Sequence, residues 1–178
     1  KGEKWDVRIC EFLSYPFADQ KEFIELCILK DTINLEGWYV TDNKNTKTLL
    51  SGTKKEGDYV LIESPKGPLN NDGDSIFVFD SFGTLIDSLT YGNGTSTSQM
   101  KAPQKGTSMV LELPFGSQAN YVQTQTSTPG KQNIYPARSL ANTQEQHSTQ
   151  RAILHEQNNF DEKKILFSEA LPNPSGSD

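Results

Sequence analysis

The stretch SIFVFDSFGTLIDSL, residues 75–89, carries the clearest structural signal in this sequence. Asp80 stands at the first position of a four-residue turn and Gly83 at the fourth, a pattern typical of a type I turn. Glycine adopts the left-handed conformation at little cost, so the chain can reverse here and place Phe79 and Leu85 on adjacent antiparallel strands. The four residues before Asp80 are all apolar, which predicts a central strand covered on both faces.

Strand patterns extend outward from this hairpin, from Trp5 to about Gln125. Short apolar or alternating runs are separated by clusters of Gly, Asn, Asp and Pro, with little helical periodicity. Among these runs are WDVRICEFL, EFIELCIL, GWYVTD, DYVLIES, SMVLELP and NYVQTQT. Short strands with frequent turn signals predict an all-β fold, either an antiparallel sandwich or a barrel.

Length and charge restrict the classes of protein to consider. The 178 residues suit one domain with an appendage better than two domains. The chain carries 23 acidic and 17 basic residues, a net charge of -6, which argues against a dedicated nucleic-acid binder. No apolar run approaches the ~20 residues that span a bilayer, and no signal peptide is recognisable. We therefore expect neither nucleic acid nor a membrane span, and Lys1 in place of Met indicates a trimmed or mature chain.

A short internal similarity links the two ends of the chain. ICEFLSYP, residues 9–16, aligns without gaps with FSEALPNP, residues 167–174, at a constant offset of 158. The aligned residues include Glu11 with Glu169 and Pro16 with Pro174. This similarity predicts one complete module followed by the first strand of a second copy.

Several motifs occur in an order that is found in a known domain family. They are EFIEL (22–26), LEGWYVTD (35–42), EGDYVLIES (56–64), LNNDGDSIFVFDSFGTLIDSLTYG (69–92), KGTSMVLE (105–112) and TPGKQN (128–133). In this order they resemble the lamin tail domain, most closely its prokaryotic secreted or surface-associated members. The resemblance covers about residues 5–134 and implies an immunoglobulin-like antiparallel β-sandwich. The sequence departs from the nuclear lamins because it contains no heptad repeat, so a filament-forming role is not expected.

The resemblance and the repeat together predict three regions. Residues 1–135 form a lamin-tail-like β-sandwich domain, and residues 165–178 form the opening strand of a truncated second one. Between them, residues 136–164 are rich in Gln, Asn, Ser and Thr. This polar extension is either a solvated linker or, over STQRAILHEQ, a short helix with Ser148 as its N-cap.

The expected core includes a tryptophan that follows a turn. Trp38 is large and apolar with a single N–H donor, which suits a residue that closes the end of a sandwich. The alternative role for Trp38 is an aromatic platform for a ligand. The predicted core residues are Trp38, Phe23, Ile24, Leu26, Phe77 and Phe79.

Two glutamates are the candidate site. If the first two strands pair around the turn at residues 16–20, Glu11 and Glu25 approach one another, and directly opposed like charges are destabilising. Such a pair can serve as a weak Ca²⁺ or general acid–base site. Alternatively, the two carboxylates are solvated or bonded to loop N–H groups. The acidic turn at residues 70–74 does not match the spacing of an EF-hand loop and suits an ordinary hairpin.

Cys10 and Cys27 fall on these same two strands. A register that opposes them brings the Cβ atoms near disulfide range, but cross-strand bridges are strained. Buried free thiols are the commoner outcome, so we predict free cysteines.

No pattern of a nucleophile, phosphate loop or zinc site is present. His147 and His155 lie in the polar region, far along the chain from either cysteine. We therefore expect no enzyme activity, no metal site and no cofactor. The resemblance implies a non-catalytic interaction or spacer module of a secreted or cell-surface multidomain protein. The second hypothesis is a targeting module of a larger secreted hydrolase or nuclease whose catalytic domain lies elsewhere.

The second strand copy also predicts a mode of association. A lone strand leaves N–H and C=O groups unpaired along both edges. The strand from Ile165 to Leu171 is therefore expected to pair with an edge of a neighbouring molecule, or else with an edge of its own domain.

Overall fold

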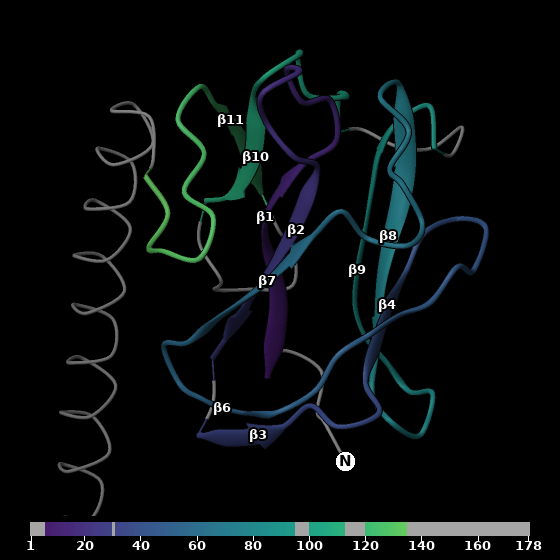
Figure 1. Cartoon of the computed structure of the whole chain (residues 1–178), viewed down its shortest axis with the longest axis vertical. Coiled ribbons are helices and arrows are strands. Elements are labelled where there is room, and N and C mark those ends of the chain that lie inside the picture. The colour runs from purple at the N-terminus through teal and green to yellow at the C-terminus, as the bar shows by residue number, and fades with distance from the viewer. Residues whose placement is uncertain (1–5, 30, 95–99, 113–119, 135–178) are drawn as a thin grey trace, which may run out of the picture. The chain divides into compact units, whose positions relative to one another are not determined.

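The computed structural model describes residues 6–29, 31–94, 100–112 and 120–134 of the 178-residue chain (Figure 1). All of them belong to the first of the two units into which the chain divides, Lys1–Pro136. They form eleven β-strands and no helix, so the described part of the chain is all-β, as predicted. It accordingly holds no helix of the length and apolarity needed to cross a membrane. The predictions for Ser148 and for the strand from Ile165 to Leu171 lie outside the described residues.

The larger sheet has five antiparallel strands in the order β11-β10-β1-β2-β7. These strands are β1 (Val7–Leu13), β2 (Phe23–Ile28), β7 (Tyr59–Glu63), β10 (Ser108–Leu111) and β11 (Tyr121–Thr124). All seven residues of β1 are buried, because the strand is paired on both sides and covered on both faces. Its sequence, VRICEFL, includes an arginine and a glutamate, which therefore need polar partners inside the fold.

The second sheet has four antiparallel strands in the order β5-β4-β8-β9. They are β4 (Tyr39–Thr41), β5 (Thr48–Leu49), β8 (Gly73–Phe79) and β9 (Leu85–Gly92). A separate two-stranded ribbon pairs β3 (Thr32–Asn34) with β6 (Thr53–Lys55). β8 is an interior strand of its sheet, between β4 and β9, as its apolar sequence predicted (Figure 1).

The β8–β9 hairpin forms at the turn expected from the sequence. The Gly83 N–H donates to the Asp80 carbonyl at 3.0 Å, and Gly83 has a φ of 77°. The Asp80 carboxylate also accepts the N–H groups of Phe82 and Thr84, which stabilises the reversal. Phe79 then pairs with Leu85, which confirms that the two residues lie on adjacent antiparallel strands.

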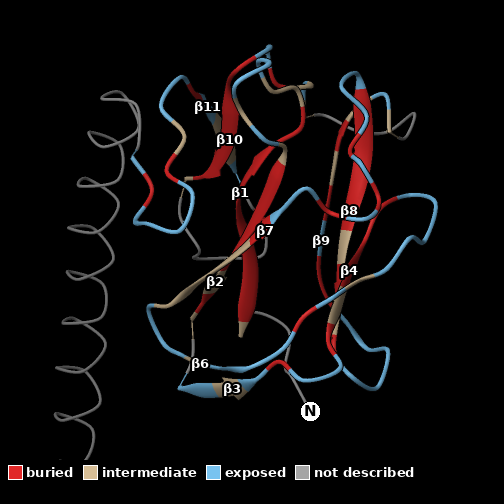
Figure 2. Ribbon diagram, viewed as in Figure 1, coloured by how far each residue is buried: buried red, intermediate tan, exposed pale blue. Residues whose placement is uncertain are grey.

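The hydrophobic core lies between the two larger sheets and draws residues from both (Figure 2). Trp38 is only 3% exposed and belongs to this core, so it is not an open ligand platform. Phe23, Ile24 and Leu26 of β2 are buried as well.

The placement of Phe77 and Phe79 in the core was wrong. Ile76 and Val78 are the fully buried residues of β8, whereas Phe77 and Phe79 are half-buried on its outer face. Both faces of the strand are apolar in sequence, so alternation alone could not show which face turns inward. On the outer face Phe79 stacks with Tyr39 of β4, at a ring-centroid separation of 5.1 Å. Cross-strand aromatic contact thus shields side chains that the second sheet does not cover.

Candidate functional site

The register of β1 and β2 brings the two candidate glutamates together. Glu11 lies directly opposite Glu25, next to the pair formed by Phe12 and Ile24. Both glutamates have an exposed fraction of 0%. Two like charges opposed in a buried position destabilise a sheet unless they are hydrogen-bonded or share a proton.

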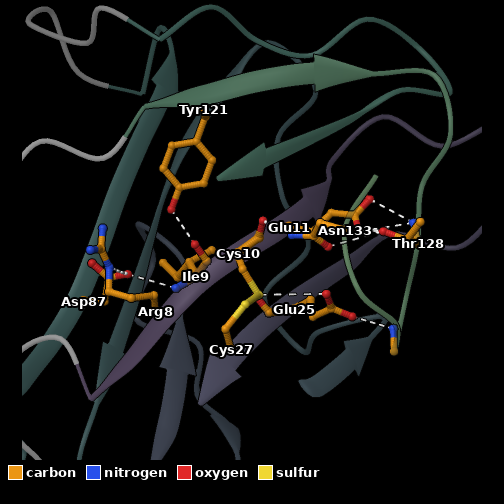
Figure 3. Close-up of a disulfide and its surroundings, with 11 residues drawn as sticks. Arg8, Ile9, Cys10, Glu11, Glu25, Cys27, Asp87, Tyr121, Thr128 and Asn133 are labelled. Atoms are coloured by element: carbon orange, nitrogen blue, oxygen red, sulfur yellow. Dashed lines mark hydrogen bonds and ion pairs between the residues drawn. A yellow bond between two sulfur atoms is a disulfide. The ribbon is translucent and has the colours of Figure 1, made fainter. Parts of the chain in front are cut away.

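Glu11 accepts hydrogen bonds from two other parts of the chain, and Figure 3 shows those from Thr128. The Ser108 hydroxyl of β10 donates to Glu11 Oε1 at 2.5 Å. The Thr128 N–H donates to the same carboxylate, with N–O distances of 3.1 and 3.2 Å. The Thr128 hydroxyl adds a bond of 2.9 Å to Glu11 Oε2. The sequence left open whether these carboxylates are solvated or bonded to loop N–H groups, and the structure shows the second arrangement.

Glu25 has fewer donors and keeps a raised pKa. The Gly130 N–H donates to Glu25 Oε2. Burial raises the pKa of Glu25 to about 7, the Gly130 N–H opposes this increase, and the charge of Glu11 adds to it. By raising this pKa, burial favours the neutral, protonated form of Glu25 in the folded protein. With a pKa of about 7, Glu25 gains its charge only as the pH rises through neutrality.

Both glutamates are thus bonded to one stretch of chain, residues 128–133, which we call the 128–133 segment. Asn133 anchors the far end of this segment, because its side-chain amide donates to the Cys10 carbonyl at 2.9 Å. Thr128 and Asn133 are buried, while the residues between them are exposed. The segment therefore crosses over β1 and β2 with buried polar anchors at its two ends.

Cys10 and Cys27 form a disulfide, so the prediction of free cysteines was wrong. Their Cα atoms are 5.7 Å apart. The residue that lies opposite Cys27 in the ladder is Arg8, and the register shifts between Ile9 and Glu11. Cys10 is the extra residue at this β-bulge and has no ladder partner of its own. The sequence suggested regular alternation here, and the bulge that allows the sulfur atoms to meet was not visible in it.

Replacement of both cysteines by alanine should lower the free energy of unfolding by about 3 kcal/mol, because the disulfide closes a loop with a sequence separation of 17. Urea unfolding of the oxidised protein and of Cys10→Ala/Cys27→Ala measures this difference. A reducing agent should destabilise the wild type by a similar amount and leave the double variant unchanged. Equal stability of the oxidised and reduced wild-type protein would contradict the prediction.

A cavity of about 130 Å³ opens beside the disulfide. Its lining residues are Cys10, Cys27, Ile28, Leu29, Gly57, Asp58, Tyr59, Leu111 and Asn133. Neither glutamate lines it, so a molecule in the cavity would not meet their carboxylates. Because Glu11 and Glu25 are engaged by Ser108 and the 128–133 segment, the pair is arranged as a structural anchor and not as an open acid–base site.

The acidic turn at residues 70–74 is likewise engaged in hydrogen bonds. The buried Asp74 carboxylate accepts the N–H groups of Asn43, Asn70 and Ser75, at distances of 2.8 to 3.3 Å. Within the described ranges, no group of three or more His, Cys, Asp or Glu side chains is placed to hold a metal ion. Asp74 therefore organises the loop around it, as ordinary hairpin chemistry predicted.

A buried ion pair joins the two sheets, and sequence reasoning missed it. Arg8 of β1 is 2% exposed, and its Nε lies 3.0 Å from Asp87 Oδ2 of β9. The same carboxylate oxygen accepts the Ile9 N–H at 2.9 Å, and the Tyr121 hydroxyl donates to the Ile9 carbonyl at 2.6 Å (Figure 3). The available signal was an arginine within an otherwise strand-like run, which by itself suits a solvent-facing position equally well.

The fold and site define a disulfide-bonded, antiparallel all-β protein in which buried carboxylates hold strands and loops in place. No family model matches the chain, and no curated protein shows a significant match to it.

Proposed function

We propose that this chain is a non-catalytic interaction or spacer module of a secreted or cell-surface multidomain protein, with an immunoglobulin-like fold of the lamin-tail type. The resemblance of the motifs at residues 22–133 is the basis for the fold type. The antiparallel all-β architecture is compatible with it. The Cys10–Cys27 disulfide supports an extracellular or cell-surface location, because disulfides persist mainly in oxidising compartments.

An apolar row across the outer face of the four-stranded sheet carries the interaction role. The register aligns Leu49, Tyr39, Phe79 and Leu85, one residue from each strand. Leu49 is 67% exposed and Leu85 is 46% exposed, and Phe82 in the adjoining turn is 75% exposed. Exposed apolar residues are ordinary when scattered, whereas a contiguous group of them marks an interaction surface.

The centre of this row is held in one conformation by its own contacts. The rings of Tyr39 and Phe79 stack at 5.1 Å, and the Lys47 ammonium lies 3.9 Å from the centroid of the Tyr39 ring. A pre-organised surface loses little side-chain entropy on binding. Aromatic residues beside aliphatic ones are typical of the centre of protein interfaces, so the proposed partner is a protein.

A binding measurement tests this assignment. Wild-type protein is screened for binding to surface proteins of the cells that produce it, with glycans and nucleic acid as comparison ligands. Leu49→Ser/Phe82→Ser should weaken binding to the protein partner at least tenfold, since it removes the two most exposed apolar side chains of the row and its adjoining turn. Ile134→Ser is the matched control, because Ile134 is 53% exposed but lies outside the row. A partner whose affinity is unchanged by the double substitution would contradict the role of the row.

The chain is also expected to hydrolyse nothing, because the paired carboxylates of Glu11 and Glu25 are occupied by internal donors. Ester, phosphodiester and glycoside substrates should show no turnover above the uncatalysed rate. Turnover that disappears in Glu11→Gln or Glu25→Gln would overturn the non-catalytic assignment and favour a hydrolytic role.

A further inference from the structure

The 128–133 segment closes over a pair of side chains that repel each other when both are charged. Thr128 bonds to Glu11 through its N–H and its hydroxyl, and Gly130 bonds to Glu25 through its N–H. These described bonding groups, two N–H groups and a hydroxyl, are all neutral donors. The segment therefore supplies hydrogen bonds to the pair but no compensating charge.

The charged and titratable groups around Glu25 do not relieve the repulsion. Glu11 faces it from β1, and Tyr59 of β7 lies close enough for the charge of Glu25 to raise the pKa of Tyr59 further, beyond the larger effect of burial. Lys131, the residue after Gly130 in the segment, is exposed to solvent. The Cys10–Cys27 disulfide does not titrate.

The disulfide also determines which element can move. It joins β1 and β2 one residue from Glu11 and two residues from Glu25. Each strand is further paired on its other side, β1 with β10 and β2 with β7. Repulsion between the carboxylates therefore cannot be relieved by separating the strands. The 128–133 segment is exposed between its anchors, and its departure would let water reach both carboxylates.

We propose that the 128–133 segment is a proton-controlled closure: it stays bound across β1 and β2 while Glu25 is protonated, and it opens when Glu25 ionises opposite Glu11. Protonation keeps Glu25 neutral and leaves Gly130 bonded to it. Deprotonation places a second buried charge beside Glu11, and opening hydrates that charge. The domain thereby holds its 128–133 segment at acidic pH and releases it at alkaline pH.

The direction and size of the pH dependence follow from the linkage between proton binding to Glu25 and closure of the segment. The pKa of Glu25 is about 7 in the closed form and takes its ordinary value of 4.5 when hydrated. A group with a raised pKa stabilises the closed form fully below its ordinary value and loses this contribution as pH rises through the raised value. Between pH 5 and pH 8 the ratio of closed to open segment should fall by about 70-fold for these two values.

Amide hydrogen exchange of the full chain measures the closure directly. The exchange rate of the Gly130 N–H is converted to a protection factor, which removes the intrinsic pH dependence of exchange. Val78, in the other sheet, serves as the reference for global unfolding. The protection factor of Gly130 should fall by about 70-fold from pH 5 to pH 8 and should stay below that of Val78, because the segment opens without global unfolding. A constant Gly130 protection factor, or one equal to that of Val78 at each pH, would overturn the proposal.

Two matched variants separate this site from other glutamates. Glu25→Gln stays neutral at every pH, so Gly130 should remain protected at pH 8. Glu22→Gln is the control, because burial also raises the pKa of Glu22 to about 7 but its partner is the Leu69 N–H. The pH dependence at Gly130 should persist in Glu22→Gln, and its loss there would contradict the proposal.

A titration of the wild type decides the question if Glu25→Gln does not fold. The carboxyl carbon of Glu25 and the amide proton of Gly130 are followed by NMR from pH 4 to pH 9. Both signals should change with one common midpoint near 7. A Gly130 midpoint near the ordinary glutamate value, or no change with pH, would overturn the proposal.

Discussion

Arg8→Met is expected to lower the free energy of unfolding by about 3–5 kcal/mol, the range for removing one partner of a buried ion pair. Methionine fills a similar volume and leaves the Asp87 carboxylate in a position that is only 8% exposed. Asp87 would keep the N–H groups of Ile9 and Ser88 but lose the opposite charge of Arg8. Urea-induced unfolding at neutral pH measures the loss.

A second substitution tests whether the unpaired charge of Asp87 causes the loss of stability. Asp87→Asn removes the charge and keeps a side-chain oxygen that can accept the Ile9 N–H. Arg8→Met/Asp87→Asn should therefore recover about half or more of the lost stability, because the penalty of burying an unpaired charge exceeds the gain from the pair itself. A double variant that is no more stable than Arg8→Met would show that the free energy of unfolding falls mainly because the packing of the Arg8 side chain is lost.

Trp38→Ala is expected to cost about 3–5 kcal/mol, the usual range for truncating a buried large aromatic side chain. Trp38 is 3% exposed and packs in the core shared by the two sheets, so its removal leaves a cavity that rigid strands can fill only in part. Its backbone bonds to Leu35 and Leu50 do not depend on the side chain and should persist. The measurement is again equilibrium unfolding in urea.

Phe82→Ala provides the matched control for the tryptophan. Phe82 is 75% exposed in the β8–β9 turn, so its truncation should change stability by only about 0.5 kcal/mol or less. A cost below about 1 kcal/mol for Trp38→Ala would instead indicate that the indole contributes little to packing. The alternative role for Trp38, an aromatic ligand platform, would then need to be reconsidered.

Local signals in the sequence were sufficient for the strands and the hairpin. The turn at Asp80 and Gly83 forms because a side-chain acceptor is needed at its first position and a glycine at its fourth, and both requirements are satisfied within the turn. The turn places Phe79 and Leu85 on adjacent antiparallel strands, as predicted. The approach of Glu11 to Glu25 could also be predicted from the sequence, because it depends only on two consecutive strands joined by a short connection.

The partners of the buried polar groups could not be predicted in the same way. Thr128 binds Glu11 from 117 positions away along the chain, and Asp87 binds Arg8 across a separation of 79. Nothing in the sequence indicates that Thr128 is the donor to Glu11, or that Asp87 is the acceptor for Arg8, rather than some other polar residue. Only the packing of one sheet on the other, and the path of the 128–133 segment, selects which of them meet.

The sequence by itself determined the all-β class, the main hairpin and the placement of most apolar strands, because turn chemistry and alternation act over a few residues. The tertiary structure decided which face of β8 is buried, where β1 bulges, and that Cys10 and Cys27 are bonded. A bulge shifts every later residue of a strand relative to its partner, and both faces of β8 are apolar, so only the completed packing distinguishes the alternatives.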